Sequence, residues 1–198
     1  MTDLLWPTAP RRAKGQRPEV RQWCSPAERA ELIQTEGMDA DRHERARQVM
    51  VSLDMDQDWL ATLDPASPEW VVEWQRGTVD AYSAGDLDWL LERTDPEIEI
   101  VQPPEIPGGS SYRGHEGLID ALLDWPLEWE DFSLEPKRIF ALDDSRAVVV
   151  AVHCGRSRRM EIEVEAEIVW LFSFEGERVR RWDMFMSLDA ALEAAGSS

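Results

Sequence analysis

The stretch YSAGDLDWLLERTDPEIEIVQ, residues 82–102, contains the end of one helix, a second short helix and the start of a strand. Gly85 is placed to end the first helix, because glycine adopts the left-handed backbone that closes a helix without strain. Asp86 can cap the next helix, which carries leucines on one face and stops at a Thr-Asp-Pro sequence. The alternation in residues 97–102 is typical of a half-buried strand. The stretch therefore predicts a tight helix pair that leads into a sheet.

Helical and strand patterns continue on both sides of this stretch. Residues 68–84 present an apolar stripe at three- and four-residue spacing, and a third helix is predicted over 115–124. Strands separated by short hairpin-type connections are predicted at 132–142, 146–155, 160–174 and 177–187. Three helices followed by antiparallel strands predict an α+β domain over 69–198, in which a curved antiparallel sheet wraps around three helices.

Residues 1–68 are expected to form an extension to this domain. Residues 1–24 hold three prolines and scattered arginines without a regular period, which predicts a mobile arm. The sequence SPAE begins a helix that Gly37 is placed to end, and a second helix is predicted over 39–53. Acidic residues are mixed through both helices, so a packing or dimer-clasping role is favoured over a DNA-binding helix-turn-helix.

The composition excludes several classes of protein. The net charge is −19 and is concentrated after residue 48, which disfavours nucleic acid as a partner. The longest apolar run, AVVVAV, is far shorter than the roughly 20 residues that span a bilayer, so no membrane partner is expected. Cys24 and Cys154 fit neither a disulfide framework nor a zinc motif. Because the first residues do not resemble an export signal, we expect a cytoplasmic location.

Several short motifs occur in the order found in SnoaL-like proteins of the nuclear-transport-factor-two superfamily. These motifs are DAYSAGDLDWLLERTDPEIEI, YRGHEGL, WEDF, EVEAEIVWLFSFEGERV and MSLDAALEAAG, within residues 69–196. The resemblance implies a cone in which a bent sheet encloses a deep, mostly apolar pocket. It also implies a homodimer formed through the outer face of the sheet, for which Val169, Leu171, Trp182 and Met184 are the candidates. Relatives include ketosteroid isomerases, polyketide cyclases and limonene epoxide hydrolases, so the fold alone does not identify a function.

Asp183 is the candidate catalytic residue. If Glu-Gly forms the tip of the hairpin 160–187, Asp183 and Arg181 share an otherwise apolar face with Trp170. A carboxyl group on such a face is costly unless it is paired or neutral, and a neutral one can act as an acid or base. The segment WDMF, residues 182–185, also resembles the segment of limonene epoxide hydrolases that contains their acid–base aspartate.

His153 is the candidate partner of Asp183 in a proton-shuttling pair. The alternative is a half-exposed histidine at the end of a strand. The pocket is expected to be lined by aromatic, small and charged side chains, namely Tyr82, Trp89, Trp125, Ala166, Trp170, Arg181 and Phe185. The tryptophans either pack the core or form a stacking wall for a flat ligand.

Other features weaken specific enzymatic or metal-binding roles. The glutamates at alternate positions 161–167 point in parallel about 7 Å apart, which suits solvent better than one metal ion, so no metal is expected. Where the relatives place catalytic groups, this chain has AVHC at 151–154, Gln102, Trp170 and Thr78. Epoxide hydrolase and ketosteroid isomerase activities are therefore doubtful.

Two hypotheses follow from the sequence. The first is a cofactor-free acid–base enzyme, of the cyclase, isomerase or hydrolase type, that acts on an apolar polycyclic or terpenoid small molecule. The second is a noncatalytic ligand-binding or dimerisation module of the same fold, in which Asp183 forms a salt bridge with Arg181. An unpaired Asp183 that faces a cavity would favour the first, and a bidentate bond from Arg181 would favour the second.

Overall fold

The structure of the chain, a computed structural model, describes residues 39–103, 110–127, 129–158 and 161–196. These residues belong to one unit that spans 35–198. The arm expected at 1–24 and the helix that was expected to end at Gly37 lie outside the described residues.

Helices α4 (Glu69–Ala84) and α5 (Leu87–Glu92) form the tight pair that the sequence predicts. Gly85 has a φ of 66°, and its backbone N–H donates back to carbonyls in the last turn of α4. The side chain of Asp86 caps α5 by accepting a hydrogen bond of 3.0 Å from a backbone N–H in its first turn. Strand β1 (Thr94–Val101) follows directly. Local signals therefore determine where these two helices end and begin.

The other elements largely follow the predicted order. They are α2 (Asp39–Ser52), α3 (Gln57–Ala61), β2 (Ser111–Arg113), α6 (Gly114–Leu127), β3 (Trp129–Ala141), β4 (Arg146–Ser157), β5 (Glu163–Glu175), β6 (Arg178–Phe185) and α7 (Leu188–Gly196). The sequence did not predict α3, β2 or α7. The first two are too short for a helical or alternating period to show.

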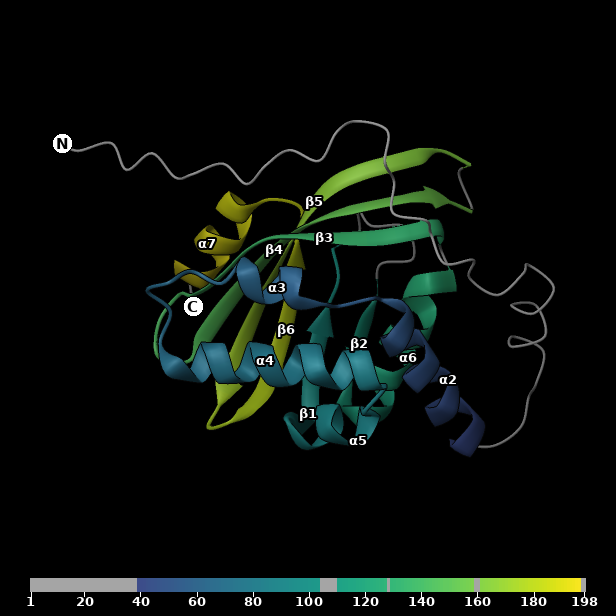
Figure 1. Ribbon diagram of the computed structural model, residues 1–198, viewed down its shortest axis with the longest axis horizontal. Coiled ribbons are helices and arrows are strands. Elements are labelled where there is room, and N and C mark those ends of the chain that lie inside the picture. Colours follow the sequence, from purple (N-terminus) through teal and green to yellow (C-terminus); the bar gives the residue numbers. More distant parts are fainter. Residues whose placement is uncertain (1–38, 104–109, 128, 159–160, 197–198) are drawn as a thin grey trace. The chain divides into compact units, whose positions relative to one another are not determined.

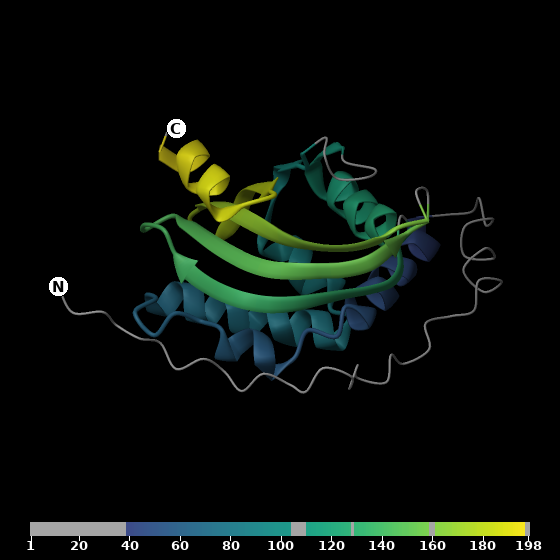
Figure 2. The same ribbon diagram turned by 90° about the horizontal axis from the view of Figure 1, so that it is seen from above.

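The six strands form one curved, mixed sheet in the order β2-β1-β6-β5-β4-β3. Neighbouring strands are antiparallel except β1 and β6, which run parallel. The predicted α+β class and curved sheet are thus confirmed, with one parallel pair that the sequence did not predict. Helix α4 lies along one face of the bowed strands and α7 lies against the opposite face (Figures 1 and 2). We call the face toward α4 the inner face and the face toward α7 the outer face.

Each face of the sheet is covered by its own apolar cluster. On the inner face, side chains such as Val149, Ile168 and Trp170 pack with residues of α2, α3 and α4. On the outer face, Val169 and Leu171 pack beneath Ala191 and Ala195 of α7. No helix among the described residues is long and apolar enough to cross a membrane.

The predicted register of the β5–β6 hairpin is wrong. The turn lies at Gly176–Glu177, where Gly176 has a φ of 61°, and this two-residue shift preserves which side chains share a face. A bulge at Arg180 then adds one residue to β6, so that Ser173 pairs with Arg181 and Leu171 pairs with Asp183. Because side chains alternate along a strand, a shift of one residue moves each later side chain to the opposite face.

Candidate functional site

An apolar cavity of about 120 Å³ lies between the inner face of the sheet and the helices that cover it. Its wall includes residues of α2, α3, α4, α5 and α6 and of five strands. Aromatic side chains form much of this wall, namely Trp59, Trp74, Tyr82, Phe132, Trp170, Phe172 and Trp182. Trp59 stacks on Trp170 with ring centroids 6.3 Å apart and an angle of 8° between the planes. The cavity is therefore suited to apolar and aromatic molecules.

The expected extension contributes part of this wall. The cavity is lined by Val49 from α2, by Leu53 and Met55 from the segment that follows it, and by Trp59 from α3. Met50, on the same face of α2, is fully buried. The sequence signal was present in the apolar face predicted over 39–53, but the pattern does not reveal what that face packs against. Residues 39–61 therefore help to build the site.

The cavity wall contains several polar side chains but few ionisable ones. Among the described residues, the wall includes no Asp, Glu, His, Lys or Arg side chain. Tyr82 is its one ionisable group, and burial raises the pKa of this hydroxyl to about 12. Tyr82 is therefore protonated at neutral pH and can donate a hydrogen bond.

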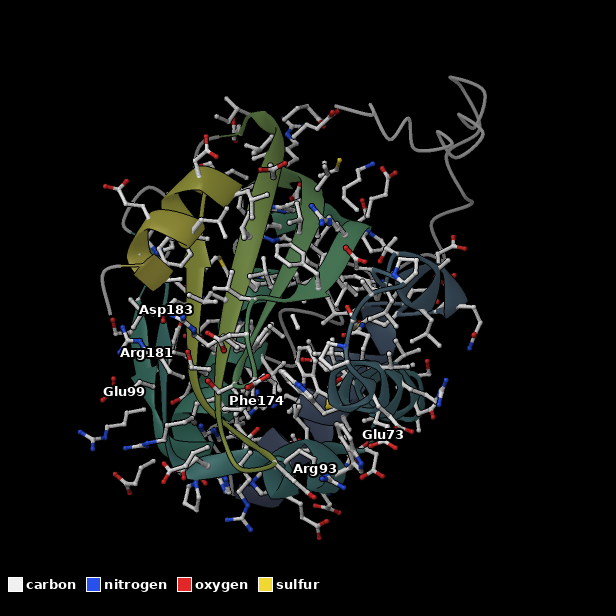
Figure 3. All side chains as sticks on the ribbon, turned by 90° about the vertical axis from the view of Figure 1, so that its left-hand side faces the viewer. Glu73, Arg93, Glu99, Phe174, Arg181 and Asp183 are labelled. Carbon is white, nitrogen blue, oxygen red and sulfur yellow. The ribbon has the colours of Figure 1, made fainter. Side chains whose placement is uncertain are left out.

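Asp183 lies on the outer face of β6, opposite Leu171, and does not line the cavity. Arg181 binds its carboxylate in a bidentate manner, with Nε and Nη2 at 2.7 and 2.8 Å from the two oxygens. A third guanidinium nitrogen of Arg181 donates to Glu99 on β1 at 2.6 Å. The hydrogen bond to Asp183 is the main cause of the raised pKa of Arg181. Figure 3 shows the three side chains on the side of the sheet away from Glu73 of α4.

His153 lies on the inner face, beyond the cavity, and it is 2% exposed. Its ring packs edge-on against Trp129 at 4.1 Å between centroids and lies 5.0 Å from Phe132. Burial lowers the pKa of His153 to about 4, so the imidazole is neutral at physiological pH. Because His153 and Asp183 lie on opposite faces of the sheet, the expected pair does not form. The alternative of a half-exposed histidine is also wrong.

The remaining predicted pocket residues divide into two groups. Tyr82 and Trp170 line the cavity. Trp89 does not, because its ring packs over Gly77 of α4, where an added Cβ would lie 2.3 Å from the indole. Ala166 pairs with His153 beyond the cavity, and Phe185 packs in the outer cluster.

Trp125 lies in α6, but its side chain is not among those described. Most of the other lining residues were not predicted from the sequence, among them Gln75, Trp182 and Met184. Trp182 and Met184 face inward because of the bulge at Arg180. Gln75 is 1% exposed and lines the cavity from α4. The sequence could have indicated that Gln75 is buried, because it lies on the apolar stripe of α4, four residues after Val71.

Within the described ranges, no group of three or more His, Cys, Asp or Glu side chains is arranged to hold a metal ion. Glu163, Glu165 and Glu167 are exposed on the outer face of β5.

Comparisons with known proteins agree with this architecture. An NTF2-like protein from Burkholderia xenovorans LB400 is 25% identical, with a TM-score of 0.51 over 65% of this chain and 97% of that chain. An NTF2-like protein of unknown function from Burkholderia pseudomallei K96243 is 16% identical, with a TM-score of 0.51 over 64% of this chain and 97% of that one. Bal32a from a soil-derived mobile gene cassette is 18% identical, with a TM-score of 0.51 over 64% and 95%. These likenesses show the fold.

The search of curated proteins gave no significant match. A family model described as SnoaL-like domain matches residues 75–182, which is more than half of the chain. The match begins inside α4 and ends in β6, so it includes most of the cavity wall but not α2 and α3. The chain belongs to the SnoaL-like domain family.

Proposed function

We propose that this protein binds a small, largely apolar molecule of about one ring in its inner cavity, without acid–base catalysis by Asp183. The aromatic-lined volume of about 120 Å³ carries the proposal. An engineered apolar cavity of roughly 150 Å³ holds one benzene molecule, so this cavity suits a single ring better than a polycyclic skeleton. The sequence led us to expect a polycyclic or terpenoid ligand. The volume favours a monocyclic terpenoid within that expectation, and a monocyclic aromatic compound beyond it.

The chemistry of the wall favours binding over catalysis. A cofactor-free cyclase, isomerase or hydrolase needs a group at the ligand that exchanges a proton near neutral pH. The Tyr82 hydroxyl, with a pKa of about 12, is a hydrogen-bond donor and a poor base at that pH. Asp183 is engaged by Arg181 on the other face of the sheet, which supports a structural ion pair.

The proposal is tested by a size series in thermal unfolding, with toluene, naphthalene and a four-ring steroid as probes. Toluene at about 100 times its Kd should add about 2.7 kcal/mol to the free energy of unfolding, which corresponds to several degrees in Tm. The steroid should leave Tm unchanged. Stabilisation by the steroid alone would contradict the proposed size, and no stabilisation by any probe would contradict the proposed binding.

A matched pair of variants locates the binding event. Ala121 lines the cavity from α6 and is 5% exposed, so Ala121→Leu should fill part of the space and weaken toluene binding. Ala190 is exposed on α7, and Ala190→Leu makes the same change outside the cavity. Equal toluene affinity in both variants would place the binding elsewhere.

Homodimerisation and a cytoplasmic location remain predictions. The side chains first considered for the dimer interface need correction, because Trp182 and Met184 line the cavity. Val169 and Leu171 are buried beneath α7. A dimer formed through the outer face would therefore have to use the part of the sheet that α7 leaves uncovered.

A further inference from the structure

Three side chains in the cavity wall contain buried polar atoms that lack a hydrogen-bond partner among the described residues. They are Nε2 of Gln75 on α4, Nε1 of Trp170 on β5 and Nε1 of Trp182 on β6. Buried polar groups in native proteins are nearly always satisfied, by protein, water or ligand. Three exceptions in the wall of one cavity therefore need an explanation.

The three side chains line the same cavity from separate elements. Trp170 and Trp182 project from neighbouring strands onto the inner face, with ring centroids 6.2 Å apart and planes at 86°. Gln75 lies in the middle of α4, which covers that face. The side chain of Gln75 is 1% exposed, so bulk water does not reach it. Whatever satisfies these groups must lie inside the protein.

The chemistry of the three groups limits what can satisfy them. An indole N–H only donates, so both tryptophans require an acceptor. The amide of Gln75 can present either end, because its nitrogen and oxygen exchange by rotation. Among the described wall residues there is no Lys or Arg to balance an anion, and an unpaired buried charge is very costly. The complementary ligand is therefore neutral and contains a hydrogen-bond acceptor.

We infer that the cavity takes a neutral single-ring carbonyl compound, whose oxygen accepts hydrogen bonds from Gln75 and from the indoles of Trp170 and Trp182. This inference rests on the proposed binding function and adds the class of ligand. The ring would lie against the aromatic wall, and the carbonyl oxygen would lie at the donors.

Two other polar groups of the wall provide a contrast. The Thr78 hydroxyl donates to the carbonyl of Trp74 at 2.9 Å, and the Thr94 hydroxyl donates to the carbonyl of Leu90 at 2.8 Å. Both donors are already used within the chain. Thr78 lies on the same helix as Gln75, three residues later, and lines the same cavity. It is therefore a matched control for Gln75.

The test uses two probes of nearly equal shape, acetophenone and α-methylstyrene. Acetophenone has a carbonyl oxygen where α-methylstyrene has a methylene group. Affinities are measured by calorimetry on the full chain. We expect acetophenone to bind roughly tenfold more tightly, since each well-made hydrogen bond gives a factor of about that size. Gln75→Met, which keeps the length of the side chain, should reduce this preference at least threefold. Thr78→Val should leave the preference unchanged.

The indole signals give a second, direct readout. Of the ten tryptophan Nε1–H signals in a proton–nitrogen correlation spectrum, those of Trp170 and Trp182 are assigned by their loss in Trp170→Phe and Trp182→Phe. Acetophenone should shift both signals downfield, as expected for a new hydrogen bond, and α-methylstyrene should not.

The outcomes separate the two proposals. Binding of neither probe would overturn the proposed function and this inference together. Equal affinity for both probes would overturn the inference alone, because water would then satisfy the donors equally well. An unchanged preference in Gln75→Met, or indole signals that respond equally to both probes, would also overturn it.

Discussion

The polar side chains on the inner and outer faces of the sheet differ in charge and in hydrogen bonding, although alternate residues of the same strands build both faces. On the inner face, the polar side chains are neutral and several have no partner among the described residues, as at Gln75 and Trp182. On the outer face, Arg181 joins the carboxylates of Asp183 and Glu99. At Arg181 on the outer face the charges are paired, whereas at Gln75 and Trp182 on the inner face hydrogen-bond donors have no partner among the described residues.

A single residue sets this difference in β6. The bulge at Arg180 turns Trp182 inward and Asp183 outward. Without it, the carboxylate of Asp183 would point toward the cavity and the indole of Trp182 would point away. Bulges are known to redirect side chains in this manner near functional sites. The bulge thus selects a neutral, donor-rich cavity over an acidic one.

The largest expected effect is on the inner face, at Trp59. Trp59 is 2% exposed and stacks on Trp170, so Trp59→Ala should lower the free energy of unfolding by about 3–5 kcal/mol. Urea denaturation measures this loss. Trp59→Phe keeps an apolar ring at the position and should lose less than half as much. A loss below about 1 kcal/mol in Trp59→Ala would show that α3 is an appendage with little part in the core.

Local sequence signals predicted the ends of α4 and α5 correctly, because such signals depend on few residues. Gly85 and Asp86 end and begin helices through their own backbone and side-chain chemistry. The composition of the site depends on strand register and on the packing of distant segments, which such local signals do not contain. No glycine or proline in RVRRWDMF indicates the bulge at Arg180.

Apolar periodicity in the sequence also predicts burial without showing what a side chain contacts. Tyr82 and Trp170 lie on apolar faces of α4 and β5, and both line the cavity. Trp89 has the same kind of position but packs over Gly77, where a missing side chain leaves room for its ring. The stripe identifies the buried face, but it does not distinguish a residue that lines a cavity from one that fills the core.

An intermediate effect is expected at His153, and it depends on pH. Its pKa is lowered by burial from the usual 6.5 to about 4, so the folded state favours the neutral ring. The stabilisation is complete above pH 6.5 and is lost progressively as the pH falls from 6.5 to about 4. Between pH 7.5 and pH 4.5, wild type should lose about 3 kcal/mol through this group.

Urea denaturation at the two pH values measures this loss in wild type and in His153→Leu. Carboxylates titrate in both proteins, so the difference between their pH profiles isolates the imidazole. The variant should be less sensitive to acid by about 3 kcal/mol. Identical profiles would mean that the ring is hydrated or charged in the folded protein, in contradiction to its packing against Trp129.

The smallest expected effect is on the outer face, at Asp183. Its side chain is 15% exposed and that of Arg181 is 42% exposed, so solvent screens much of the pair. Asp183→Asn should therefore cost only about 1 kcal/mol of unfolding free energy, and it should leave toluene affinity unchanged. Glu165→Gln, on the exposed row of β5, is the control for removing one outer negative charge. If Asp183→Asn abolished binding at unchanged stability, the carboxylate would have to reach the cavity, and the face assignment of the whole of β6 after Arg180 would be wrong.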